Sequence, residues 1–195
     1  MRLQVSKTTF DRPKLYDLIA IFYDDSTSLG RFQSIRSREC PPVYRNLLAH
    51  SSHMTVTVEK HHGELVDVEV LQESQLAGEY RRKILLRRQS DRKVVQFGIV
   101  RMNLKTLAPS VQQQITSGEI PLGRILIENE LMREVQLSGL WKVECGEELA
   151  GYFQIPYGGF TYGRTARILV DSTPMIELLE IVAPEPNVES AMLES

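Results

Sequence analysis

The sequence predicts an α+β fold, in which a single, mostly antiparallel β-sheet has helices inserted between its strands. Two observations lead to this class. Strand-like segments, in which apolar residues alternate with polar ones or run together, recur through most of the 195-residue chain. Turn-type residues, without a helix, separate most of these segments. Because strands joined by turns pair antiparallel, whereas a helix after each strand indicates a parallel sheet, the pattern favours α+β.

The first part of the chain, residues 1–46, is expected to be an irregular lead-in with little helix that packs on the rest. Its apolar block at 18–23 (LIAIFY) is short, and the polar segment 24–28 (DDSTS) that follows has the composition of a turn or a helix cap. We expect one domain from 47 to 184. The tail, residues 185–195, is acidic with few apolar residues and is expected to be disordered.

Several strands are expected in the first half of the domain. Residues 54–58 (MTVTV) alternate apolar and polar side chains, as a half-buried strand does, although this segment is short enough to be helical. Residues 66–70 (VDVEV) alternate in the same way. Residues 80–88 and 94–101 are strand-like on either side of the polar stretch 88–93 (RQSDRK), so we expect a β-hairpin.

A helix is expected between Ala108 and Gly118, where the composition becomes polar and helical. Pro109 is tolerated in the first turn of a helix, and Gly118 is a natural C-terminal stop. A second short helix is expected after Pro121. Four further strand-like segments follow, at residues 130–143, 152–155, 161–170 and 175–182.

The composition argues against several classes of protein. The formal net charge of -2 gives no overall attraction to nucleic acid or to an anionic membrane. No apolar run approaches the roughly 20 residues of a membrane span. The N-terminal residues lack the apolar segment of a secretory signal, so we expect a cytoplasmic protein. Cys40 and Cys145 stand far apart without a metal-binding spacing, and both are expected to be reduced thiols.

Side-chain alternation singles out Arg82 as a candidate binding residue. In the predicted strand 80–88, Arg82 projects to the same face as Ile84 and Leu86. A buried guanidinium is costly unless an anion meets it, and its planar fork suits a carboxylate. We therefore expect Arg82 to bind a carboxylate, supplied either by the protein itself or by a ligand.

The last predicted strand places an acid on an apolar face in the same way. Glu180 is in register with apolar residues such as Ile176 and Val182. Glu177 lies on the opposite face, which is also apolar, so alternation alone does not choose between the two glutamates. A buried carboxyl suits acid–base or hydrogen-bonding chemistry. The structural alternative is that Glu180 pairs with Arg82.

All four histidines, His50, His53, His61 and His62, fall in one short segment. The spacing His50-x-x-His53 suggests a metal site, but no carboxylate or cysteine completes a known ligand set, so a polar loop is the simpler interpretation and no metal is expected. The basic run 81–93 contains no aromatic residues for stacking on bases. It is therefore expected to be a solvated hairpin and not a nucleic-acid surface.

Five motifs, in order along the chain, resemble those of chorismate pyruvate-lyase, or 4-hydroxybenzoate synthase. The resemblance is strongest to the divergent branch of the family in plastoquinone-making photosynthetic lineages. It implies a chorismate lyase-like fold for the domain. The motifs lie at residues 47–55 (LLAHSSHMT), 80–86 (YRRKILL), 120–126 (IPLGRIL), 161–169 (TYGRTARIL) and 174–184 (PMIELLEIVAP).

The resemblance also implies roles for the two residues that alternation singles out. In that family an arginine on the strand that opens the central hairpin binds the ring carboxylate, and Arg82 matches this position. A glutamate four residues before a proline on the last strand lies at the far end of the ring. Glu180, four residues before Pro184, matches it better than Glu177 does.

The same resemblance implies that four more residues belong to the expected site. Met54 and Leu122 match residues that contact the buried ligand through backbone or apolar groups. Arg164 or Arg167 is expected to meet the pyruvyl carboxylate of the substrate.

The implied reaction removes the enolpyruvyl group of chorismate to give 4-hydroxybenzoate and pyruvate, without a cofactor. The product would supply the aromatic ring of a quinone. The same fold occurs in the effector-binding domains of GntR-type regulators, which bind a small ligand and catalyse nothing. Those regulators carry a helix-turn-helix domain, which residues 1–46 do not resemble. The alternative to a lyase is therefore a stand-alone binding protein. The expected partners are chorismate and 4-hydroxybenzoate, with no nucleic acid and no membrane span.

Overall fold

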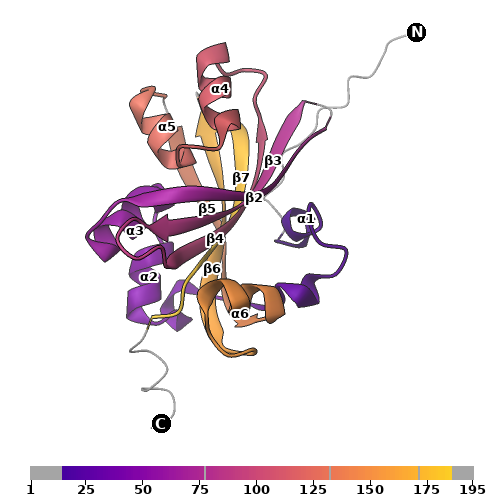
Figure 1. Cartoon of the computed structure of the whole chain (residues 1–195), viewed down its shortest axis with the longest axis vertical. Helices are drawn as coiled ribbons and strands as arrows, with labels where there is room; N and C mark the ends of the chain where they lie inside the picture. The colour runs from indigo at the N-terminus through magenta and orange to yellow at the C-terminus, as the bar shows by residue number, and fades with distance from the viewer. Residues whose placement is uncertain (1–14, 77, 132, 171, 186–195) are drawn as a thin grey trace.

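The computed structural model describes residues 15–76, 78–131, 133–170 and 172–185. Within these residues seven strands form one antiparallel sheet in the order β1-β5-β6-β7-β4-β3-β2 (Figure 1), which confirms the predicted fold class. The strands are β1 (Gly30–Ile35), β2 (Val66–Leu76), β3 (Glu79–Arg88), β4 (Val94–Asn103), β5 (Arg133–Cys145), β6 (Phe160–Val170) and β7 (Thr173–Val182).

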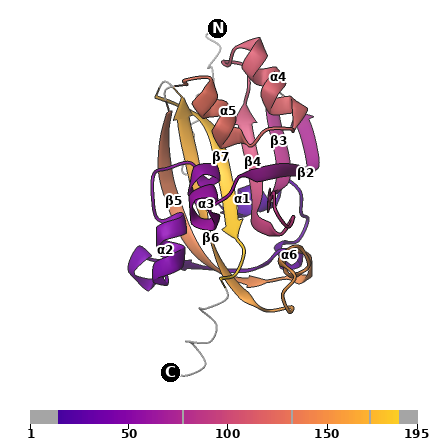
Figure 2. The same ribbon diagram turned by 60° about the vertical axis from the view of Figure 1, so that its left-hand side comes forward.

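Helices cover both faces of the sheet (Figures 1 and 2). Helices α2 to α5 lie over one face, and α1 and α6 lie over the other. None of the helices in the described ranges is long and apolar enough to cross a membrane. Their bounds are α1 (Leu15–Ile19), α2 (Pro42–Leu48), α3 (Met54–His62), α4 (Pro109–Ser117), α5 (Leu122–Glu128) and α6 (Glu147–Phe153), with short 3-10 helices at Ser26–Ser28 and Ser37–Glu39.

The alternation of side chains along the strands divides the core in two. On β3, Leu85 packs with the α1 and α6 side, whereas Ile84 and Leu86 pack against α2 and α3. On β7, Leu179 packs on the α1 and α6 side, and Leu178 packs beneath α4 and α5. Any cavity on the α2 to α5 side is therefore lined by every second residue of each strand.

Most of the predicted elements are confirmed. β3 and β4 form the expected hairpin, and the N–H of Arg88 donates to the carbonyl of Lys93 at 3.0 Å across its turn. Helix α4 ends at Gly118, whose φ of 70° lies in the left-handed region that favours glycine. Helix α5 begins directly after Pro121. The strand predictions at 66–70, 161–170 and 175–182 correspond to β2, β6 and β7, and the prediction at 130–143 corresponds to β5.

Two predicted strands are helical instead. The segment 54–58 forms the start of α3, where Met54 and Val58 are buried while Val56 is 44% exposed. Positions four residues apart share a face in a helix as well as in a strand, so the pattern of buried residues fits both. The segment was short enough to be helical, and a helix is what the structure shows. The strand predicted at 152–155 is wrong. Helix α6 continues through Phe153 and is capped by Gln154, which has a φ of 56°.

The lead-in is more regular than the sequence predicts. It contains α1 and α2, and β1 pairs with β5 from Gly30 opposite Cys145 to Ile35 opposite Leu140, as an edge strand of the sheet. A side chain at Gly30 would place its Cβ 2.3 Å from the carbonyl oxygen of Glu144, so only glycine fits where β1 meets β5. The expectations for residues 1–14 and for the tail beyond Glu185 fall outside the described residues.

Candidate functional site

A cavity lies between the sheet and the first turns of helices α3 and α5. The empty space within it and at its open mouth amounts to about 540 Å³ in total. Most of the wall is apolar, with three charged side chains set into it. The lining residues are His53, Met54, Thr55, Val68, Arg82, Ile84, Leu86, Gln96, Gly98, Val100, Pro121, Leu122, Gly123, Val135, Arg164, Ile168, Leu178 and Glu180.

Arg82 on β3 is a buried cation in this wall, and its side chain is among the largest that the fold buries, at 1% exposure. One terminal nitrogen donates to the carbonyl of Ile115 at 3.3 Å, and Nε has no hydrogen-bond partner among the described residues. Burial lowers the pKa of the guanidinium, and the Tyr80 hydroxyl with Glu73 behind it acts in the opposite direction. No described carboxylate forms an ion pair with Arg82.

Glu180 on β7 lines the same cavity but is already paired. Nε of Arg164 on β6 donates to Oε2 of Glu180 at 2.7 Å, and the two residues lie directly opposite each other across the β6–β7 ladder. The side chains are 1% and 10% exposed, respectively. The alternative pair between Arg82 and Glu180 is not formed.

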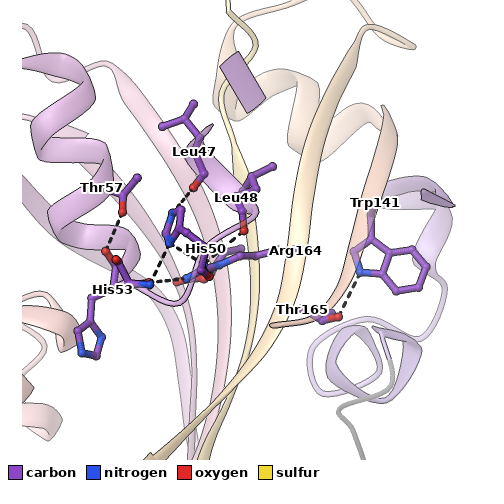
Figure 3. Close-up of polar contacts among 10 residues, drawn as sticks. Leu47, Leu48, His50, His53, Thr57, Trp141, Arg164 and Thr165 are labelled. Atoms are coloured by element: carbon purple, nitrogen blue, oxygen red, sulfur yellow. Dashed lines mark hydrogen bonds and ion pairs between the residues drawn. The ribbon is translucent and has the colours of Figure 1, made fainter. Parts of the chain in front are cut away.

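Arg164 also holds the loop that leads into α3. Its terminal nitrogens donate to the backbone carbonyls of Leu48, His50 and Ser52 at 3.5, 3.1 and 3.2 Å. Figure 3 shows the guanidinium of Arg164 against the turn that carries His50. Since its donors point to the protein's own acceptors, Arg164 acts here by positioning Glu180 and the loop.

His50 is fixed by the same loop and is not arranged as a metal ligand. Its Nε2 lies 2.6 Å from the Leu47 carbonyl, and its Nδ1 lies 3.0 Å from the Ser52 N–H and 3.4 Å from Arg164 (Figure 3). Burial, followed by the charge of Arg164, lowers the pKa of the imidazole. These contacts suit the neutral ring with its hydrogen on Nε2. The ring of His53 points away from His50.

Met54 and Leu122 line the cavity from the first residues of α3 and α5, where the resemblance leads us to expect them. The two helices approach closely at Gly123. A Cβ atom there would lie 2.9 Å from the Thr55 hydroxyl and 3.2 Å from Cβ of His53. Gly123, which belongs to the motif at residues 120–126, therefore permits the contact that closes this end of the cavity.

Glu177 and Arg167 do not line the cavity. Glu177 is ion-paired with Arg101 on the other face of the sheet, where Nε of Arg101 donates to it at 2.6 Å. Nε of Arg167 donates to Oε1 of Gln136 at 2.7 Å on β5. Of the two glutamates that alternation left open, only Glu180 faces the cavity.

Gln96 on β4 is a polar residue of the wall that sequence reasoning missed. It is 2% exposed, and its side-chain oxygen has no hydrogen-bond partner among the described residues. The signal was available, because Gln96 is the one polar side chain in the apolar run VVQFGIV at residues 94–100 and shares a face with Gly98 and Val100.

Two further charged clusters lie outside the cavity. The basic run is neutralised largely by acids of neighbouring segments, with pairs such as Arg87 to Glu69 and Arg92 to Asp67. This arrangement agrees with a solvated hairpin. His61, His62 and Glu185 gather at the end of α3, where Nε2 of His61 lies 3.0 Å from the carboxylate of Glu185. That contact connects α3 to the chain beyond β7.

Comparison with known proteins identifies the fold and no closer relationship. No family model matches the sequence, and no curated protein matches it. Among solved structures 26 chains match. The effector domain of PhnF from Mycobacterium smegmatis is similar with a TM-score of 0.53 at 7% sequence identity, covering 69% of this chain and 90% of that domain.

Two longer chains are similar over part of their length. PhnF itself gives a TM-score of 0.51 at 8% identity, covering 68% of this chain and 64% of PhnF. The possible transcriptional regulator YydK from Bacillus subtilis gives 0.42 at 10% identity, covering 60% and 57%. The chain thus spans less than two thirds of either regulator. The similarity to the PhnF effector domain shows the fold of a GntR-type effector domain, which is a chorismate lyase-like fold.

Proposed function

We propose that the cavity binds a small ring carboxylate and that the protein is a chorismate lyase. The observation that carries the proposal is Arg82: a guanidinium at 1% exposure, without a carboxylate partner in the described part of the chain, opens onto an apolar cavity that also contains Glu180. A cation buried in this way is stabilised when an anion enters. A carboxylate matches the planar donor group of arginine.

The rest of the wall suits the ring of such a ligand. Met54, Leu122 and Leu178 provide apolar surface, and Gly98 adds no side chain to the wall. A ring carboxylate places one charge at Arg82 and buries its carbon skeleton elsewhere. Chorismate and 4-hydroxybenzoate both have this shape.

The proposed reaction balances without a cofactor. The C4–H bond of chorismate breaks, its electron pair completes the aromatic ring, and the C3–O bond to the enolpyruvyl group breaks with its pair on oxygen. The enol then takes a proton on carbon to become pyruvate. Glu180, which is paired with Arg164, accepts either the C4 proton or a hydrogen bond from the C4 hydroxyl. The 4-hydroxybenzoate would provide the aromatic ring for quinone synthesis.

Turnover of chorismate tests the proposal. Purified protein should form 4-hydroxybenzoate and pyruvate in equal amounts, measured by chromatography and by a coupled assay. Arg82→Met and Glu180→Gln should lose this activity. Glu177→Gln and Arg81→Met are matched controls, since both residues lie outside the cavity, and both should keep it. Activity that survives Arg82→Met would reject the assigned site.

A non-catalytic binding protein is the second candidate. It is favoured by the similarity to the effector domain of PhnF and by the ion pair with Arg164 that already engages Glu180. This candidate predicts that wild-type protein binds 4-hydroxybenzoate, that Arg82→Met does not, and that no product forms from chorismate. Product formation would exclude it.

A further inference from the structure

Gln96 has a buried side-chain oxygen without a hydrogen-bond donor among the described residues. It lies on β4 at 2% exposure and lines the cavity. Its oxygen is fully buried, and no described residue donates to it. A buried acceptor without a donor is costly, and a native fold that keeps one calls for an explanation.

The sheet register places Gln96 and Arg82 at opposite ends of the cavity. Arg82 pairs with Val100, and Gln96 stands four residues along the same strand from Val100, so both side chains project to the same face. Four residues of strand span about 13 Å. Glu180 pairs with Gly98, midway between the two ends. This length accommodates a six-membered ring with a hydrogen bond at each end.

The two ends of the cavity have opposite hydrogen-bonding character. Within the described part of the chain, Nε of Arg82 is a buried donor without an acceptor, and Oε1 of Gln96 is a buried acceptor without a donor. A ligand that satisfies both carries a carboxylate at one end and an O–H or N–H group at the other. A ring acid with no such group leaves Gln96 as unsatisfied as it is in the free protein.

We propose that Gln96 accepts a hydrogen bond from the hydroxyl of the ligand, and that the cavity selects ring acids with a hydroxyl or amino group opposite the carboxylate. This inference rests on the proposed binding of a ring carboxylate at Arg82. In the lyase reaction C4 of chorismate bears both a hydroxyl and the departing hydrogen. Gln96 holds the hydroxyl, which leaves Glu180 for the proton.

Binding of three benzoates tests the assignment by calorimetry. 4-Hydroxybenzoate and 4-aminobenzoate offer a hydrogen to Gln96, and 4-methylbenzoate has the same size without one. Wild-type protein should bind the first two about tenfold more tightly than the third, the effect of roughly one hydrogen bond. Gln96→Met, which keeps the volume and removes the amide, should bind all three within about threefold of one another. Gln33→Met, at an exposed glutamine on β1, should behave like wild type.

Failure of this inference is distinguishable from failure of the proposed function. If Gln96→Met keeps the tenfold preference, the role of Gln96 is overturned while ring-acid binding stands. If wild type binds none of the three, both proposals fall. The wild-type series also gives a result that does not depend on how Gln96→Met folds, because equal affinities for 4-hydroxybenzoate and 4-methylbenzoate would overturn the role of Gln96 directly. Side-chain amide NMR signals of wild type that move with the hydroxy acid and not with the methyl acid would support it.

Discussion

Arg164 and Glu180 form a buried ion pair across strands β6 and β7, with Nε and Oε2 2.7 Å apart. The same guanidinium donates to backbone carbonyls of the loop before α3. The pair therefore joins the floor of the cavity to the loop that leads into one of its walls. Arg82, in the same cavity, has no carboxylate partner among the described residues, and its Nε has no hydrogen-bond acceptor there. The two arginines should respond oppositely to mutation.

Arg164→Met should lower the free energy of unfolding by about 3–5 kcal/mol, because it leaves the carboxylate of Glu180 buried without its cation. It also releases the carbonyls of His50 and Ser52. Urea unfolding followed by circular dichroism measures the change. Adding Glu180→Gln to Arg164→Met should recover part of the loss, because the uncompensated charge is then removed. A cost below about 1 kcal/mol for Arg164→Met would contradict the described pairing.

Arg82→Met should leave the free energy of unfolding unchanged or raise it by about 1 kcal/mol, because an apolar side chain replaces a buried charge that has no ion-pair partner in the described ranges. The carbonyl of Ile115 keeps the N–H of Gly118 as a donor. Ligand binding should be lost at the same time. The same urea titration, compared with Arg164→Met, provides the measurement. A large destabilisation would mean that Arg82 has a structural partner.

Side-chain alternation along the strands was sufficient to identify two charged residues of the cavity, Arg82 and Glu180. Arg82 and Glu180 each stand on an apolar strand face, and strand alternation alone assigns them to the interior. Their pairing was beyond such rules. Whether Glu180 meets Arg82 or Arg164 depends on which strands are neighbours and in which register, and β6 lies beside β7 while β3 does not.

Contacts between segments far apart in the sequence also explain why some elements of the fold were predicted wrongly. Strand β1 is stabilised by pairing with β5, more than a hundred residues later in the chain, and its own pattern is weak. Residues 54–58 are helical because burial of Met54 and Val58 against neighbouring helices decides between two patterns that fit equally. Gln96 could have been predicted from the sequence, since a lone polar residue on an apolar strand is the same signal that identified Arg82.

His50 should titrate below its ordinary pKa of 6.5, because burial and the charge of Arg164 disfavour the protonated ring. A base whose pKa is lowered by folding binds more protons when unfolded. Its contribution to stability is therefore complete above pH 6.5 and declines as the pH falls below that value. NMR titration of the imidazole signals measures the pKa, and Arg164→Met should raise it. A His50 pKa at or above 6.5 in wild type would contradict the contacts of this loop.

Gly123→Ala should destabilise the fold by about 1–3 kcal/mol and weaken ligand binding, because the added methyl group meets Thr55 and His53 and forces α3 and α5 apart. Gly151 is the matched control. It lies in α6 with no atom within 4 Å of the added Cβ, so Gly151→Ala should stabilise by about 0.5–1 kcal/mol through helix propensity. Thermal unfolding and calorimetry compare the two variants. Equal effects would show that α3 and α5 do not approach as described.

The most direct test of the central claim is a crystal structure of the protein with 4-hydroxybenzoate. The account predicts that the ring lies in the cavity between the sheet and helices α3 and α5. The carboxylate should be within hydrogen-bonding distance of Nε of Arg82, and the hydroxyl should point toward Gln96 and Glu180. A ligand bound anywhere else, or a cavity that stays free of it at saturating concentration, would contradict the account.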